Sequence, residues 1–222
     1  MNFTERLLEK TTDIWEEYYK HPFVLGIQNG NLDHAKFRYY ILQDYLYLEE
    51  YLKVFALGVA KSRSAETCHL FAGYIENITH SEMDIHRGYM GELEISAEEL
   101  QHAKRALDNL SYTSYMLRLG YEEDELAILI SILACALSYE YIGKRIVKNN
   151  PAILEDPFFG PWVAGYSSED YTRENLLLIE QVERLAKGCD EERLDYLTEI
   201  FVNCSAYELE FWNFSWKGEN KA

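Results

Sequence analysis

The 222-residue chain carries 38 Asp and Glu against 21 Lys and Arg, a formal net charge of −17, and no basic cluster. Proteins that bind DNA or RNA directly neutralise phosphates with patches of Lys and Arg, so this composition argues against a nucleic-acid partner. A hydrophobic content of 48% is enough for one sizeable core, and only 12 Gly and 4 Pro interrupt it. Few breaks favour few turns and long helices.

The four cysteines form no CxxC pair and are too sparse for a disulfide framework, which favours reduced thiols in a cytoplasmic protein. They are Cys68, Cys135, Cys189 and Cys204. The N-terminal residues lack the basic-then-apolar pattern of a signal peptide. The most apolar stretch, residues 126–143, is interrupted by Ser131, Ser138 and Glu140, so we expect no membrane-spanning helix.

Apolar residues at three- and four-residue spacing predict helices throughout the first half of the chain. His21-Pro22 is expected to end the first helix, because proline cannot continue the hydrogen-bond ladder. Ser96 and Glu99 match a capping box and predict a further helix start. The expected helices are 3–19, 33–60 with Asp33 as cap or first-turn acid, 64–93 capped by Ser64, and one that begins at Ser96.

The second half continues the pattern, with a break expected at 109–111 and a helix stop at Gly120. Its expected helices are 112–119, 123–148, a short one at 158–164, one to Lys187 capped by Ser168 or Asp170, and a last one to Trp216 capped by Asp190. No alternating strand pattern, repeat or linker stands out. The sequence therefore predicts a single all-α domain over residues 1–222, a compact bundle of long helices.

Cys135 lies in the middle of the most apolar predicted helix, with Tyr139 one turn away on the same face. A buried cysteine usually packs as a small hydrophobe. The alternative is a nucleophile with a phenol as hydrogen-bonding partner. Apolar surroundings and nearby carboxylates oppose thiolate formation, so a nucleophilic Cys135 needs a base close by or deprotonation coupled to attack.

Asp44 is an unusual residue for the middle of a helix, because aspartate competes for backbone hydrogen bonds. Tyr47 follows it at i+3 and Tyr51 lies four residues further, so the three share one face. This face is either solvated or lines a functional site.

Glu82 and His86 are four residues apart and share a helix face. Such pairs can bind metal, but the Glu-x-x-His spacing of ferritin-like di-iron sites is absent at Glu82. Between the two interpretations, the spacing favours a hydrogen bond between Glu82 and His86 that positions other side chains, and not a metal site.

Glu208 shares a segment with Tyr207, Phe211 and Trp212, and Trp212 lies one turn beyond it. A carboxyl group desolvated by aromatic rings holds a proton more readily and suits proton transfer near neutral pH. Glu208 is therefore a candidate general acid and base.

These residues together resemble the TenA family, which is also called thiaminase II or aminopyrimidine aminohydrolase. The likeness extends from His21-Pro-Phe nearly to the C-terminal aromatic segment. The motifs that carry it are 21–27 (HPFVLGI), 39–47 (YYILQDYLY), 82–86 (EMDIH), 111–116 (SYTSYM), Cys135 with Tyr139 and Glu140, 162–166, and 207–212 (YELEFW). The family's fold is all-α and haem-oxygenase-like, which agrees with the helix pattern.

The resemblance implies a role for each matching residue, and Cys135 corresponds to the nucleophile of the family's cysteine-bearing branch. It implies that Asp44 holds the ring nitrogen and exocyclic amine of an aminopyrimidine, and that Glu208 is the general acid and base. The implied pocket also includes Tyr112 and Tyr139, which orient thiol and substrate, and Tyr47 and Tyr166, which form its walls. The sequence departs from the family at Ser167 and Ser168, where members often have two glycines.

The implied activity is hydrolysis of 4-amino-5-aminomethyl-2-methylpyrimidine to the hydroxymethyl pyrimidine, a step of thiamin salvage, with thiamin cleavage as a side activity. No metal or organic cofactor is required for it. The partners expected are an aminopyrimidine or thiamin, and three further copies in a homotetramer, with which the 18 tyrosines are compatible. Two alternatives remain open at this point: an indirect regulator of extracellular enzyme production, and a haem- or di-iron-binding oxygenase using Glu82 and His86.

Overall fold

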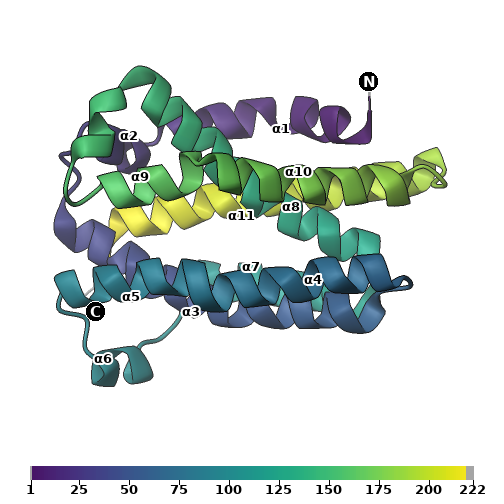
Figure 1. The fold of residues 1–222 in the computed structure, drawn as a ribbon, viewed down its shortest axis with the longest axis horizontal. Coiled ribbons are helices and arrows are strands. Elements are labelled where there is room, and N and C mark those ends of the chain that lie inside the picture. Colours follow the sequence, from purple (N-terminus) through teal and green to yellow (C-terminus); the bar gives the residue numbers. More distant parts are fainter. Residues whose placement is uncertain (1, 219–222) are drawn as a thin grey trace. The chain divides into compact units, whose positions relative to one another are not determined.

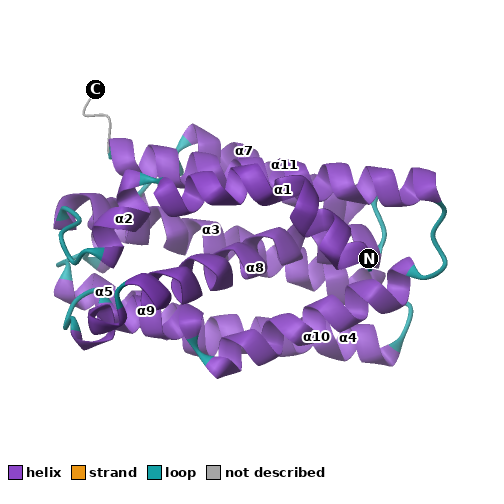
Figure 2. Ribbon diagram, turned by 90° about the horizontal axis from the view of Figure 1, so that it is seen from above, coloured by secondary structure: helices purple, strands orange, loops and turns teal. Residues whose placement is uncertain are grey.

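The structure, a computed structural model, describes residues 2–218, apart from the side chains of residues 81, 82, 84 and 85. All regular elements in this part of the chain are helices, as the sequence predicts (Figures 1 and 2). They are α1 (Phe3–Lys20), α2 (Pro22–Gln28), α3 (His34–Lys61), α4 (Ala65–Asn77), η1 (Ile78–Glu82), α5 (Met83–Glu92), α6 (Ala97–His102), α7 (Leu107–Glu122), α8 (Glu125–Asn149), η2 (Pro151–Glu155), α9 (Gly160–Ser167), α10 (Glu169–Ala186) and α11 (Glu191–Lys217). The chain forms two compact units: unit 1 holds Met1–Leu32 and Leu129–Trp212, and unit 2 holds Asp33–Ile128 and Asn213–Ala222.

The predicted helix caps are present at several starts. The Asp33 side chain accepts a hydrogen bond from the Ala35 backbone N–H at 2.8 Å, and Ser64 accepts one from Thr67 at 3.1 Å. Ser168, the first of the two predicted candidates, caps α10. Each cap satisfies an N–H group that the first helical turn leaves without an intrahelical partner.

Pro22 both ends α1 and starts a helix that the sequence analysis missed. Proline is well suited to the first position of a helix, because its fixed φ is already helical and its missing N–H is not needed there. The His21 ring nitrogen caps this short helix α2 by accepting from the Phe23 N–H at 3.2 Å.

Two predicted interruptions are wrong, since α7 runs unbroken from Leu107 to Glu122. Asn109 is buried in this helix because its amide donates to the backbone oxygen of Gln43 at 2.8 Å and to its side-chain oxygen at 3.1 Å. Gly120 is a packing residue: a Cβ there would lie 2.6 Å from Cδ1 of Leu57. Asn109 and Gly120 both make close contacts with α3, and these contacts outweigh the preference of the two residues for turns.

In unit 2, α3 packs against α4, α5 and α7 (Figure 1). The largest fully buried side chains here are Phe37, Tyr40, Phe55, Phe71 and Tyr112. The helix expected over 64–93 is present as α4 and α5, separated by the π-helical turn η1. A π turn accommodates one extra residue, so α5 is rotated by about 100°, one residue's share of a 3.6-residue turn, relative to a continuous α-helix.

In unit 1, α1 packs against α2 and α10, and α9 packs against η2 and α10 (Figure 1). The largest fully buried side chains are Leu7, Tyr18, Phe23, Phe159, Trp162, Phe201 and Trp212. Aromatic rings dominate this core, and the hydroxyl of Tyr18 donates to a backbone oxygen within it, as described below.

Helix α8 is more apolar than the sequence analysis anticipated. It contains an 18-residue window of mean hydropathy 1.8, long and apolar enough to span a membrane, and 89% of that window is buried inside the protein. Ser138 does not interrupt the apolar helix. Its hydroxyl donates a hydrogen bond to the Cys135 backbone oxygen at 2.8 Å, so the hydroxyl is satisfied without water. Extensive burial is the usual condition of a core helix in a soluble protein, and length and composition alone are weak evidence for a membrane.

Candidate active site

Four of the seven predicted site residues lie in unit 1, and all four are buried. Cys135 and Tyr139 follow each other by one turn on α8, Tyr166 comes from α9, and Glu208 comes from α11. Their exposed fractions are 9% for Cys135 and Tyr166, 5% for Tyr139 and 2% for Glu208. The Glu208 carboxyl group is therefore desolvated, as the aromatic residues near it in the sequence predict.

An aromatic cluster surrounds Tyr139. Its ring centroid lies 4.6 Å from that of Tyr166, 5.4 Å from Trp212 and 6.1 Å from Trp162. Trp162 in turn lies edge-on to Tyr166 at 4.9 Å. Rings at these separations pack tightly and exclude water, which strengthens electrostatic interactions in their vicinity.

Tyr18 of α1 is a buried phenol on which both the Cys135 thiol and the Glu208 carboxyl group act electrostatically. Burial, and next the negative charge of Glu208, raise the pKa of Tyr18 well above its ordinary value, and Cys135 and Cys204 act in the same direction. Both Cys135 and Glu208 thus lie within electrostatic range of one buried phenol. The Tyr18 hydroxyl donates to the backbone oxygen of Ser205, three residues before Glu208.

Cys204 provides a comparison for the behaviour of a thiol in this core. Burial first, and the Glu208 carboxylate second, raise the pKa of Cys204 well above its ordinary value. A buried acid close to a thiol therefore suppresses the thiolate here, as general electrostatics requires.

The other three predicted residues lie in unit 2, and they are also buried. Asp44 and Tyr47 stand on α3 and Tyr112 on α7, with exposed fractions of 4%, 3% and 1%. The rings of Tyr47 and Tyr112 stack with centroids 5.4 Å apart and planes at 29°. Burial of this α3 face rules out the alternative that Asp44 belongs to a solvated surface.

His86 is the partner of Asp44 in unit 2. Its Nε2 lies 2.7 Å from Oδ2 of Asp44, and the histidine is 2% exposed. The sequence analysis paired His86 with Glu82, but the side chain of Glu82 lies outside the described residues. Within the described side chains, no group of three or more His, Cys, Asp or Glu residues is arranged to hold a metal ion.

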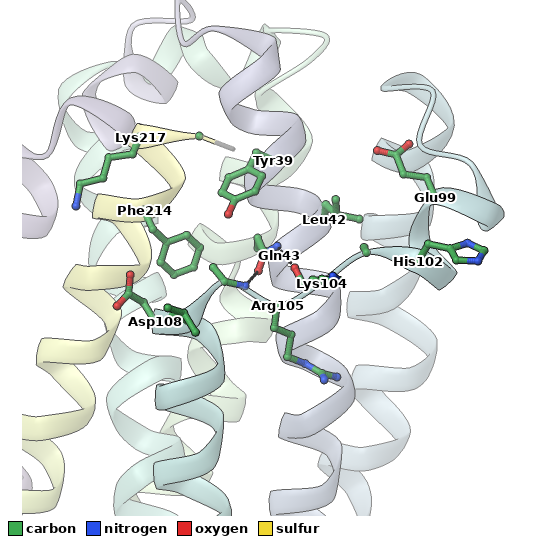
Figure 3. A pocket seen from close by; sticks show the side chains of 14 residues that line it. Tyr39, Leu42, Gln43, Glu99, His102, Lys104, Arg105, Asp108, Phe214 and Lys217 are labelled. Carbon is green, nitrogen blue, oxygen red and sulfur yellow. Dashed lines mark hydrogen bonds between the residues drawn. The ribbon is translucent and has the colours of Figure 1, made fainter. Parts of the chain in front are cut away.

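A surface hollow of about 740 Å³ opens on unit 2 and contains none of the seven predicted residues (Figure 3). Gln43 forms part of its wall, and its amide donates to the Lys104 backbone oxygen at 2.9 Å while its oxygen accepts from the Ala106 N–H at 2.9 Å. Gln43 thus fixes the loop before α7, whereas its neighbour Asp44 is bonded to α5.

The sequence analysis assigned no role to Tyr18, which contacts the helix that carries Glu208, or to Ser205, which lies on that helix. Tyr18 is simply one of several apolar-face residues of α1, and Ser205 resembles a helix-interior serine, so spacing gives no signal for either. Only the hydrogen bond between them, which joins α1 to α11, indicates their importance.

The described helices and their order define an all-α protein, and its fold is haem-oxygenase-like. A protein of that fold from Shewanella denitrificans has a TM-score of 0.77 over 96% of this chain and 92% of its own, at 14% identity. A family model described as TENA/THI-4/PQQC family matches residues 8–218. The chain belongs to this family.

Similar solved structures include a TenA family transcription regulator from Silicibacter sp. TM1040, with a TM-score of 0.88 and 26% identity over 96% of each chain. A TenA homologue from P. horikoshii OT3 has a TM-score of 0.85 and 25% identity, over 99% of this chain and 100% of its own.

Similar curated proteins carry the name aminopyrimidine aminohydrolase. One from Halalkalibacterium halodurans is 38% identical over 97% of this chain and 96% of its own length. Another from Helicobacter pylori is 38% identical over 98% of this chain and 100% of its own. These relatives place the chain among the hydrolases.

Proposed function

We propose that this protein is an aminopyrimidine aminohydrolase of thiamin salvage, which converts 4-amino-5-aminomethyl-2-methylpyrimidine and water to the hydroxymethyl pyrimidine and ammonia. Two relatives of that name at 38% identity support the substrate class. The observation that carries the proposal is the placement of a buried thiol, Cys135, and a buried acid, Glu208, within electrostatic range of Tyr18.

In the proposed reaction, Cys135 adds to the ring carbon next to the one that bears the aminomethyl group. The S–C bond forms as a ring π pair moves to the ring nitrogen, which takes up a proton. The electron pair of the 4-amino group then expels ammonia from the methylene carbon, with Glu208 giving the departing nitrogen its proton. This leaves an exocyclic alkene.

Water completes the cycle by adding to the alkene carbon, and Glu208 takes its proton. The ring nitrogen then gives up the proton that it took, and its electron pair re-forms the ring double bond and expels the Cys135 sulfur, which restores the aromatic ring and frees the product. One water is consumed and one ammonia released, so the sequence of steps needs no oxidant or reductant. A soft nucleophile that is also a good leaving group suits both ends of this cycle.

Asp44 is proposed to hold the 4-amino group and, when it carries a proton, the adjacent ring nitrogen, because both then donate to the carboxylate. As that amine expels the leaving group it gains positive charge, and a carboxylate that accepts its N–H stabilises this charge. Tyr112 and Tyr139 are proposed to orient the thiol and the substrate. Tyr47 and Tyr166 are proposed to form walls of the pocket, with Tyr166 reaching the leaving group. The ring contacts of Tyr47 with Tyr112 and of Tyr139 with Tyr166 support these roles.

The resting state of Cys135 in this proposal is the neutral thiol. Two observations support this: Cys135 is buried, and burial first and the Glu208 carboxylate second raise the pKa of Cys204 in the same unit. Cys135 therefore loses its proton as it attacks, to a base within the site.

The proposal is tested by incubating the purified protein with the aminomethyl pyrimidine and measuring ammonia and hydroxymethyl pyrimidine together. We expect both products in equal amounts. Thiamin is the second substrate to assay, and we expect slower release of its thiazole, the thiaminase II activity. Absence of ammonia from the aminomethyl pyrimidine would reject the proposed function.

The remaining expectations belong to the same proposal: a single domain over residues 1–222, a homotetramer in solution, and a cytoplasmic enzyme that uses no cofactor and binds neither nucleic acid nor membrane. The acidic charge of −17 supports the expectation about nucleic acid.

A further inference from the structure

Asp44 has one hydrogen-bond partner among the described residues, and that partner is His86. The Nε2–Oδ2 distance is 2.7 Å. Both side chains are almost completely buried, at 2% for the His86 side chain and 6% for that of Asp44. The pair connects α5 to α3 deep inside unit 2, where water does not compete for the interaction.

The direction of this hydrogen bond follows from the acceptor. An ionised carboxylate only accepts, so the His86 ring nitrogen that faces it carries the hydrogen and donates. At 2.7 Å this is a charge-assisted bond of the stronger kind. It occupies Oδ2, which leaves Oδ1 of the same carboxylate for a second donor.

Without such a bond, the carboxylate orientation would be poorly defined. The last torsion of an aspartate side chain has a broad, roughly two-fold preference, so one anchored oxygen decides where the other one lies. A single N–H donor at Oδ2 is sufficient to choose one orientation.

The local structure that brings His86 to this position is the π turn η1. It directly precedes α5 and shifts the helix register by one residue, about 100° of rotation. If the α-helix that begins after Ser64 continued without the π turn, His86 would lie on a different side of the helix. Single π turns inside α-helices occur frequently at functional sites.

We propose that His86 is a positioning residue for the substrate-binding carboxylate: its Nε2–H fixes Oδ2 of Asp44, so that Oδ1 is held ready for the exocyclic amine of the aminopyrimidine. This inference rests on the proposed function, in which Asp44 binds that amine. His86 acts through Asp44 and touches no substrate atom. It determines affinity for pyrimidines that carry the 4-amino group.

The test compares wild type with His86→Leu, which removes the donor at similar volume, and with His86→Gln, whose amide N–H reaches about as far as Nε2. Binding of 4-amino-5-hydroxymethyl-2-methylpyrimidine is measured by calorimetry. We expect His86→Leu to weaken binding by about 10- to 100-fold, the usual effect of losing a hydrogen bond to a charged group. We expect His86→Gln to restore most of the affinity, and KM to rise more than kcat falls in His86→Leu.

A second ligand separates positioning from general damage. The analogue 5-hydroxymethyl-2-methylpyrimidine lacks the 4-amino group, so we expect His86→Leu to bind it as wild type does. Equal loss of both ligands, or no loss of either, would overturn the inference. The matched control is His69→Leu, which removes an exposed histidine from α4 of the same unit and should bind both ligands normally.

Two further comparisons keep the result decisive. If His86→Leu does not fold, His86→Gln is compared with His86→Asn, whose amide is too short to reach Oδ2; equal affinities for the amino ligand would reject the inference. In the double variant with Asp44→Asn, we expect less than the sum of the two single losses, because both act on one contact. Wild type that releases no ammonia rejects the proposed function, whereas active wild type with an unaffected His86→Leu rejects only the role of His86.

Discussion

Glu140 shows at the scale of one residue how a carboxylate is kept charged in a partly buried place. It follows Tyr139 on α8 and accepts hydrogen bonds from Asn175 at 2.6 Å, Thr172 at 2.9 Å and Lys144 at 2.5 Å. Burial raises the pKa of Glu140, but the hydrogen bonds of these three donors outweigh burial and the net pKa lies below the ordinary value. The carboxylate thereby joins α8 to α10.

Replacing Glu140 therefore gives a pH-dependent loss of stability. Since the folded-state pKa is lowered, the stabilisation is present above the unfolded value near 4.5 and disappears as the pH falls through the folded-state value. We expect Glu140→Gln to lower the free energy of unfolding by about 1–3 kcal/mol at pH 7, and by less at pH 3. Urea unfolding at the two pH values measures this.

The control for Glu140 is Glu192→Gln, an exposed acid near the start of α11. It should change the unfolding free energy by less than about 0.5 kcal/mol at either pH. An equal loss for Glu140→Gln at pH 7 and pH 3 would show that its carboxylate charge is not what stabilises the fold.

At the scale of elements, α1 holds α11 at Ser205 with two hydrogen bonds. The Tyr18 hydroxyl donates to the Ser205 backbone oxygen, and the Trp15 indole N–H donates to its hydroxyl at 3.3 Å. All three side chains are buried. Because Glu208 lies three residues further along the same helix, this contact also sets the position of the proposed general acid.

Removing the phenolic hydroxyl tests this contact. We expect Tyr18→Phe to lower the free energy of unfolding by about 1 kcal/mol and to reduce kcat for ammonia release more than it changes KM. Thermal unfolding and steady-state kinetics measure the two effects. Tyr121→Phe, at an exposed tyrosine, is the control; a Tyr18→Phe protein with wild-type kcat would contradict the positioning of Glu208 by α1.

The contact of α8 with α9 depends on a glycine. A Cβ at Gly143 would lie 2.9 Å from the backbone carbon of Tyr166 and 3.1 Å from the Ser167 nitrogen. Backbone atoms cannot move aside as a flexible side chain would, so α9 has to shift. The Ser167 and Ser168 hydroxyls donate to the Val163 and Gly165 backbone oxygens, which shapes the turn at the end of α9.

Gly143→Ala should therefore destabilise the protein by about 1–3 kcal/mol, the usual cost of overpacking, and lower the activity by displacing Tyr166. Gly73→Ala is the matched helical control, because nothing lies within 4 Å of its added Cβ. There we expect a gain of up to about 1 kcal/mol from helix propensity. Similar stability of the two variants in chemical unfolding would contradict the close packing at Gly143.

The helices themselves were largely predictable, because their apolar spacing and their caps at Asp33, Ser64 and Ser168 are local signals. The errors occurred where a tertiary contact outweighs local preference, at Asn109 and Gly120. The π turn η1 has no comparable sequence signal.

The candidate site was less accessible to sequence reasoning. Spacing alone favours a packing role for Cys135 in an apolar helix, and only the family resemblance assigns it a reaction. The buried Asp44 is hydrogen-bonded to His86, which is 42 residues away in the chain. Pairings over such separations are decided by packing between helices, which no local pattern encodes.

At the scale of the whole molecule, the proposed assembly is four copies of a 26.1 kDa chain, about 104 kDa. Closed symmetric assemblies are the usual form of soluble oligomers. We expect sedimentation velocity at micromolar concentration and 150 mM salt to give a single species of that mass. A 26 kDa species across the whole concentration range would contradict the tetramer.

The central claim is that Cys135 is the nucleophile of an aminopyrimidine hydrolase, and the most direct test is the rate of ammonia release by Cys135→Ala beside Cys68→Ala. Both variants remove one thiol, but Cys68 lies on α4, which carries none of the residues given a role in the reaction. We predict at least about a 1,000-fold loss for Cys135→Ala, as expected when a covalent nucleophile is deleted, and wild-type activity for Cys68→Ala. Full activity in Cys135→Ala would contradict the account.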